Sequence, residues 1–207
     1  MAPEDQEGVD ESKRATLRRF AALGAATPLA GLANAGSVDS DSDAPDAITG
    51  YLAATPGAHF SKIRDDLQLG TGETQHHLRR LENTGAIESR KDGDYRRYFL
   101  AGRFSAYEQV ALGYLRRETA RGIVIALLED PTLSAGEIAD RLDVSRPAVS
   151  GYAGQLDEAG LLSRSDGYAV EEPETMLVLL VRYADSFDGD ALRLAAQADD
   201  LITHEPR

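Results

Sequence analysis

The sequence contains no cysteine and only four histidines, and this scarcity excludes several kinds of chemistry at the outset. Disulfide bonds and thiolate metal sites both require cysteine. Two of the histidines, His76 and His77, are adjacent, but neighbouring side chains on a helix point about 100° apart and cannot share a metal ion without other ligands. We therefore expect no metal site and no cofactor.

The usual sequence signatures of catalysis are missing as well. The chain has no glycine-rich phosphate loop, no nucleophile elbow and no triad of metal ligands at a useful spacing. The sequence therefore argues against an enzyme, and it identifies no small-molecule effector.

Positive charge is scarce overall but unevenly distributed. The formal net charge is −13, with −4 in residues 1–45, +1 in residues 46–103 and −10 in residues 104–207. Nucleic-acid binding depends on clustered Lys and Arg, so the bulk charge taken alone argues against such a partner. Residues 46–103 are the one segment without an excess of acidic residues, and any nucleic-acid site is expected there.

Lysine is rare among the 22 basic residues, with only Lys13, Lys62 and Lys91, whereas aspartate is abundant. This bias resembles that of proteins from salt-adapted archaea. In concentrated salt, the release of counterions favours DNA binding less than it does in dilute buffer. An acidic DNA-binding protein is then less paradoxical, and its contacts rely more on hydrogen bonds and shape.

The segment over residues 13–35 resembles a twin-arginine signal with a small-residue cleavage site. It opens with four basic residues, namely Lys13, Arg14, Arg18 and Arg19. The uncharged run over residues 20–35 ends in Ala-Asn-Ala and contains a proline, and it is short for a membrane span of about 20 residues. Three interpretations stay open: a helix lying on the fold, an export signal and a membrane anchor.

Two segments of the chain repeat each other at a fixed offset of 75 positions, headed by Pro56 and Pro131. The identical pairs include Ile63 with Ile138, Asp65 with Asp140, Leu67 with Leu142, Leu81 with Leu156, and Gly85 with Gly160, and upstream Ile48 with Ile123 and Leu52 with Leu127. We infer that the chain contains the same small domain twice.

The first copy has the pattern of three helices and a hairpin. An apolar stripe at residues 48–52 is followed by Pro56, which breaks helical periodicity. Ser61 is suited to cap a second helix, and a third helix is expected over residues 71–83, with Gly85 in the left-handed position after it. This order, closed by a hairpin, is that of a winged helix domain, in which the short turn before the third helix leaves that helix projecting.

The hairpin of the first copy is expected from strands over residues 86–90 and 95–100. In the second copy, Ser145 caps the third helix, Pro147 lies in its first turn, and the hairpin over residues 161–170 is shorter and holds one arginine. The predicted fold is mainly α with small β-hairpin wings, as tandem winged helix-turn-helix domains with linking and C-terminal helices. The expected division is a tail with an acidic linker over 1–45, a first domain over 46–103, a linking helix over 104–121, a second domain over 122–173 and C-terminal helices over 174–207.

The third helix and the wing of the first copy carry the candidate DNA contacts. In such a domain, outward side chains near the start of the third helix face base edges, and the wing reaches phosphates. We expect four side chains to face the core, namely Thr74, His77, Leu78 and Leu81. The candidates on the helix are Thr71, Glu73, Gln75, His76 and Arg79. Those on the wing are Arg90, Lys91, Arg96 and Arg97, with Tyr95 or Tyr98 stacking on sugar.

Each candidate has a plainer alternative. The basic wing is compatible with a solvated surface hairpin, although four cations within eight positions are unusual in so acidic a chain. In the second copy the candidates are Ser145, Arg146 and Ser150, flanked by acidic residues. Direct DNA contact and a degenerate domain used for dimerisation or shape support both stay open there.

The C-terminal part is expected to form two helices, over residues 174–187 and 190–202. The apolar run over residues 176–181 is more than one face of a monomer needs. Packing against the repeats and a homodimer interface are both compatible with it.

Residues 74–87 (TQHHLRRLENTGAI) resemble the recognition helix and following strand of ArsR-like and MarR-like winged helix repressors. Residues 46–172 resemble archaeal predicted transcription regulators with two winged helix domains, in which a Pro-Gly-Ala-His-Phe stretch, here residues 56–60, opens the first helix-turn-helix. The resemblance implies a cytoplasmic, often dimeric regulator of double-stranded DNA, with its reading helix on residues 71–79 and its wing on residues 90–97. The cysteine motifs of ArsR-like metal sensors have no counterpart here.

Two other functions are compatible with the pattern. Paired winged helix domains also serve in chromosome-condensation accessory subunits that bind other proteins, but a protein-binding module has no need for four cations in its first wing. The second is a membrane-anchored regulator, held through residues 20–35, which would be membrane-associated as well as DNA-binding.

Overall fold

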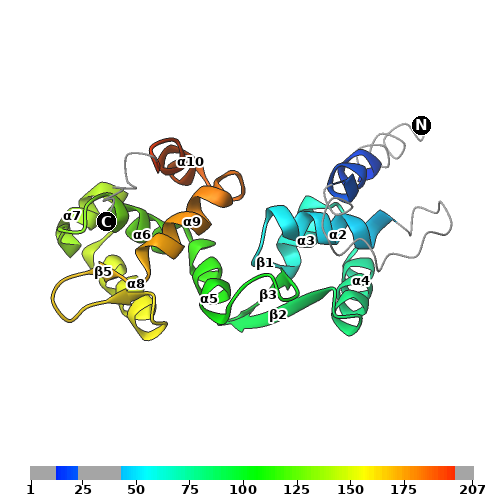
Figure 1. Ribbon diagram of the computed structural model, residues 1–207, viewed down its shortest axis with the longest axis horizontal. Helices are drawn as coiled ribbons and strands as arrows, with labels where there is room; N and C mark the ends of the chain where they lie inside the picture. Colours follow the sequence, from blue (N-terminus) through cyan, green and yellow to red (C-terminus); the bar gives the residue numbers. More distant parts are fainter. Residues whose placement is uncertain (1–12, 23–42, 199–207) are drawn as a thin grey trace, which may run out of the picture. The chain divides into compact units, whose positions relative to one another are not determined.

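The computed structural model describes residues 13–22 and 43–198, which divide between Ser105 and Ala106 into two compact units (Figure 1). The described chain is mostly helical, with small antiparallel strands, so the predicted fold class is confirmed. The first unit consists of a helix over residues 13–22, called here the N-terminal helix, followed by α2(Asp43–Ala54), β1(Ala58–His59), α3(Phe60–Asp66), α4(Thr71–Asn83), β2(Ile87–Asp92) and β3(Tyr95–Leu100).

The Pro-Gly-Ala-His-Phe stretch turns the chain from α2 into α3. Gly57 has a φ of +77°, a left-handed conformation that glycine adopts without steric cost. The next two residues form β1, where Ala58 pairs with Tyr98 and His59 with Arg97 of β3. His59 then caps α3, because its Nδ1 accepts a hydrogen bond from the Lys62 backbone N–H at 3.3 Å. The sequence did not predict β1, since two residues are too short to show alternation.

The wing of the first unit is the antiparallel hairpin β2–β3, which is paired from Ile87 with Leu100 to Asp92 with Tyr95. Gly93 lies at its turn with a φ of +59°. The sheet order is β1-β3-β2, so β3 is the central strand and is paired on both sides.

The core of the first unit lies between its helices and this sheet. Ile48, Leu52 and Ile63 are completely buried, and Leu78 of α4 is 1% exposed. Leu17 of the N-terminal helix is only 4% exposed and belongs to the same core. The N-terminal helix is therefore an integral element of this unit.

The second unit repeats the helical order of the first. Its elements are α5(Ala106–Leu115), α6(Glu118–Glu129), α7(Ala135–Leu142), α8(Arg146–Glu158), β4(Leu162–Ser163), β5(Ala169–Val170), α9(Pro173–Arg182), η2(Ala184–Ser186) and α10(Gly189–Ala196). Helices α6, α7 and α8 begin 75 positions after α2, α3 and α4, and β4 begins 75 positions after β2. The internal repeat inferred from the sequence is therefore present in the fold.

The linking segment differs from the expectation of one helix over residues 104–121. It contains α5 and the first turn of α6, which starts at Glu118, before the expected end of the linking helix. Arg121, in this first turn of α6, is only 6% exposed, although arginine usually lies at the surface.

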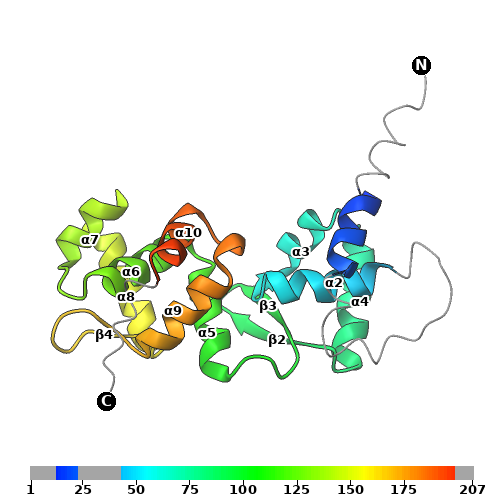
Figure 2. The ribbon, with the colours of Figure 1, turned by 45° about the horizontal axis from the view of Figure 1, so that its top comes forward.

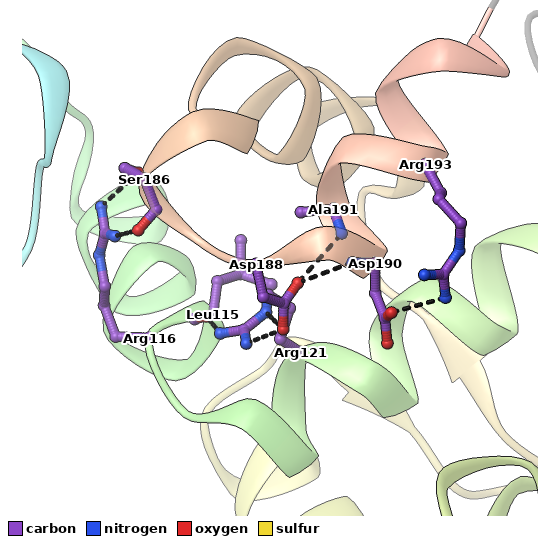
Figure 3. A network of polar contacts seen from close by, with 8 residues as sticks. All are labelled: Leu115, Arg116, Arg121, Ser186, Asp188, Asp190, Ala191 and Arg193. Atoms are coloured by element: carbon purple, nitrogen blue, oxygen red, sulfur yellow. Dashed lines mark hydrogen bonds and ion pairs between the residues drawn. The ribbon is translucent and has the colours of Figure 1, made fainter.

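Arg121 of α6 is buried because it contacts the residue that caps α10, and so it holds α10 against the rest of the second unit (Figure 3). Its Nη1 donates to the Leu115 carbonyl at 2.7 Å, and its Nε donates to Asp188 Oδ2 at 3.0 Å. The other Asp188 oxygen accepts from the backbone N–H groups of Asp190 at 3.2 Å and Ala191 at 3.1 Å, which caps α10. Partial burial raises the pKa of Asp188, but the hydrogen bonds from Arg121 and the backbone outweigh it and hold the pKa below its ordinary value.

Half of the apolar run over residues 176–181 is buried in the second unit. Met176, Leu179 and Leu180 are at most 2% exposed, whereas Val178 is 59% exposed. These three residues of the run therefore pack within the second unit. Within the part of the chain that the structure describes, no helix is both long and apolar enough to cross a bilayer. Residues 23–35 of the signal-like segment lie outside the described residues.

Candidate nucleic-acid interface

Helix α4 separates its side chains into a core face and a solvent face. Thr74, His77, Leu78 and Leu81 are buried, as the sequence predicted. The exposed side chains are Thr71, Gln75, His76, Arg79, Arg80 and Asn83. The exposed face therefore combines amide, imidazole and guanidinium groups and carries no carboxylate.

Glu73 lies in the first turn of α4, but its carboxylate has structural partners. Glu73 Oε2 accepts a hydrogen bond from the Gly70 backbone N–H at 3.0 Å and an ion pair from Lys13 Nζ at 3.1 Å. Partial burial raises its pKa, but the Gly70 N–H and the Lys13 ammonium outweigh this and leave the pKa below its ordinary value. Glu73 thus caps α4, which corrects its assignment as a candidate DNA contact.

The wing presents three of its four predicted cations to solvent. Arg90 and Lys91 are exposed, and the Arg96 side chain is 63% exposed. Arg96 Nε donates to Ser89 Oγ at 2.7 Å, and its Nη2 lies 3.2 Å from Glu82 Oε1 at the end of α4. This contact ties Arg96 to the end of α4 while leaving most of its side chain accessible.

Arg97 does not face solvent, which corrects the sequence-based assignment. It is 3% exposed, its Nη1 donates to the Gly57 carbonyl at 3.0 Å, and its Nε pairs with Asp92. Successive side chains of a strand point to opposite faces, so Arg96 and Arg97 lie on opposite faces of the sheet. Arg97 therefore holds the turn at Gly57 against the wing, and it is not part of the candidate interface.

The two tyrosines of the wing also differ. Tyr98 is 6% exposed and cannot stack on a sugar, whereas Tyr95 is 50% exposed. The Tyr95 ring stacks on His59 with centroids 4.9 Å apart and planes at 29°. Tyr95 alone stays available for such a contact.

The corresponding surface of the second unit is poor in positive charge. Ser145 Oγ accepts from the Ala148 N–H at 3.3 Å and so caps α8. Arg146 is exposed and its guanidinium lies against Gly136 of α7, while Ser150 is exposed farther along α8. The second wing has strands of two residues each, with Arg164 as its one basic residue.

Formal charge separates the two units clearly. The described residues of the first unit carry 13 basic and 9 acidic groups, a balance of +4. Those of the second unit carry 8 and 16, a balance of −8. Among the described residues, no cluster of three or more histidine or carboxylate groups is placed to hold a metal ion.

Each unit thus has the helix-turn-helix and antiparallel wing that define the winged helix-turn-helix class. Comparison with known families agrees with this class. Residues 42–112 match a family described as an N-terminal HTH domain, and residues 116–163 match the winged helix-turn-helix DNA-binding family. The chain therefore contains two winged helix-turn-helix DNA-binding domains in tandem, as the sequence predicted. Neither the curated proteins nor the solved structures compared with the chain include a match.

Proposed function

We propose that the chain is a transcription regulator that binds double-stranded DNA through α4 and the wing β2–β3 of its first unit. One observation carries the proposal: the exposed face of α4 has no carboxylate, and the adjacent wing exposes Arg90, Lys91 and Arg96. The one acidic residue in the first turn of α4, Glu73, is neutralised by Lys13. In a chain of net charge −13, this is the arrangement that phosphate attraction requires.

The side chains of α4 differ from those of the wing in what they can recognise. Gln75 can donate to and accept from an adenine edge, and Arg79 can donate two hydrogen bonds to guanine. Arg90, Lys91 and Arg96 would hold phosphates and so fix the register of α4 in the major groove. Because the second unit is acidic, we propose that it contributes little to phosphate attraction. Its role would instead be to help hold the first unit in place on the DNA.

The first experiment identifies the DNA target. Genome-wide immunoprecipitation of the tagged full chain recovers the bound sites, and fractionation of the same cells shows whether the protein is cytoplasmic or held at a membrane. Recovery of the protein with chromosomal DNA supports a regulator. A chain that associates with other proteins and ignores duplex DNA at every ionic strength would support the protein-binding alternative.

The second experiment separates base reading from phosphate attraction. Arg79→Ala is expected to weaken binding to a recovered site by about 1–3 kcal/mol and to change binding to a mixed-sequence duplex much less. Fluorescence anisotropy with both duplexes measures the two effects, and Arg182→Ala in the second unit is the matched control. Equal losses on both duplexes would contradict a base-reading role for Arg79.

The oligomeric state is part of the proposal. We propose a homodimer, since isologous pairing is common among DNA-binding regulators whose sites are palindromic. The exposed Val178 and Leu192 of the second unit, 59% and 46% exposed, support such a surface. Analytical ultracentrifugation of the full chain tests this, and a monomer at all concentrations would rule it out.

A further inference from the structure

We propose that the N-terminal helix, residues 13–22, is a third DNA-contact element that brings arginines to the phosphates beside the recognition helix. The inference rests on the proposed function, because it assigns an additional contact to the same interface. It also gives a role to the basic residues that made this segment look like an export signal.

The N-terminal helix is held on the first unit by apolar contacts. Leu17 is 4% exposed inside the core. The Phe20 ring meets Tyr51 of α2 edge to face, with centroids 5.3 Å apart and planes at 70°. Figure 2 shows this helix, in dark blue, over α2 and the start of α4. Its position is therefore set by the folded domain itself.

The start of the N-terminal helix lies at the functional end of α4. Lys13 Nζ is 3.1 Å from Oε2 of Glu73, in the first turn of α4. In winged helix domains, this first turn is the part of the third helix that approaches base edges. If α4 enters a groove of the duplex, a helix anchored there would lie beside one of the two phosphate backbones that border the groove.

The side chains on the outside of the N-terminal helix are cationic. Arg14, Arg18 and Arg19 are exposed, and the helix contains no acidic residue. Arg14 and Arg18 are four positions apart and therefore share one face. Without this helix, residues 43–105 carry 9 basic and 9 acidic groups, a balance of zero. The helix supplies the whole +4 of the described first unit, so it decides the sign of the local field.

The test replaces the three exposed arginines in the full chain with Arg14→Gln, Arg18→Gln and Arg19→Gln. The matched control replaces Arg164, Arg182 and Arg193 of the second unit with Gln, which removes the same charge. Binding to a fluorescein-labelled duplex of mixed sequence is measured by anisotropy over a range of salt concentrations. Thermal unfolding of both variants is compared with the parent chain, and no change is expected because the side chains are exposed.

The N-terminal variant is expected to lose at least about tenfold in affinity at low salt. Its plot of log K against log salt should be shallower than that of the parent by about two to three, since each phosphate contact contributes about 0.9. The control should keep the slope of the parent. A slope equal to that of the parent, or a loss no larger than in the control, would overturn the inference. Tighter binding would also overturn it, because the helix would then be blocking α4.

A second measurement locates the helix directly. Because the chain has no cysteine, Arg18→Cys creates a single thiol that can carry a photocrosslinker. Crosslinking to the duplex is expected at position 18 and not from Arg182→Cys, and the absence of crosslinks at position 18 would contradict the inference.

The two proposals fail in distinguishable ways. If the parent chain binds no duplex, both fail. If Arg79→Ala and Arg96→Ala weaken binding but the triple Gln variant does not, only the inference about the N-terminal helix fails.

Discussion

At the scale of single residues, two adjacent arginines of the wing have different roles. Arg96 is 63% exposed and touches Glu82 and Ser89, whereas Arg97 is 3% exposed and donates to Gly57 and Asp92. A buried ion pair that loses one partner leaves an uncompensated charge, which costs far more than the loss of an exposed contact.

This difference predicts opposite outcomes for the same substitution at neighbouring positions. Arg97→Ala is expected to lower the free energy of unfolding by about 2–4 kcal/mol, because Asp92 and the Gly57 carbonyl lose their buried donor. Arg96→Ala is expected to stay within about 0.5 kcal/mol of the parent in stability. It should instead reduce the salt slope of DNA binding by about 0.9.

Urea unfolding and salt-dependent anisotropy check this pair on the same preparations. If Arg97→Ala left stability unchanged and weakened DNA binding, Arg97 would belong to the interface and its burial would have no energetic meaning.

At the scale of elements, the capping of α3 by His59 makes the stability of the first unit depend on pH. Partial burial, followed by the positive charges of Arg97 and Lys62, lowers the pKa of the His59 imidazole. The folded domain then binds fewer protons than the unfolded chain. This contribution to stability is complete above the ordinary histidine pKa of about 6.5 and is lost as the pH falls below it toward the folded value.

We therefore predict that the parent chain loses stability as the pH falls below about 6.5 by a component that His59→Asn removes, since asparagine caps a helix without titrating. Urea unfolding at a series of pH values, followed by circular dichroism, measures both proteins. Parallel pH profiles would show that His59 is not the titrating group.

The helices could be predicted from the sequence where local periodicity determined them. The core face of α4 followed from the spacing of Leu78 and Leu81, and the repeat located α8. The burial of Arg121 could not be predicted, because its partner Asp188 lies 67 positions away in the sequence. Strand β1 was missed because two residues paired to a distant strand leave no local pattern.

At the scale of the whole molecule, positive charge is concentrated in the first unit, and the chain as a whole is acidic. The described part of the first unit has a balance of +4 and that of the second unit −8. Such a distribution confines phosphate attraction to one domain and repels DNA from the rest of the surface. The two units share a fold but are not equivalent in charge.

The candidate site could be predicted only in part, because contacts between distant residues decide which side chains reach the surface. Composition and spacing identified α4 and the wing as the cationic region, but they could not tell which cations are used inside the domain. The pairing of Lys13 with Glu73 joins residues 60 positions apart, and it appears only once the chain is folded. The same contact joins residues 13–22, the described part of the signal-like segment, to the first domain.

The most direct test of the central claim is a titration of the isotope-labelled full chain with duplex DNA, followed by the amide chemical shifts of both units. We predict that the largest shift changes fall in residues 71–79 of α4 and residues 90–96 of the wing, and that they weaken as salt is raised. Changes confined to the second unit, or spectra that do not respond to duplex at low salt, would contradict the assignment of α4 and the wing as the DNA-binding surface.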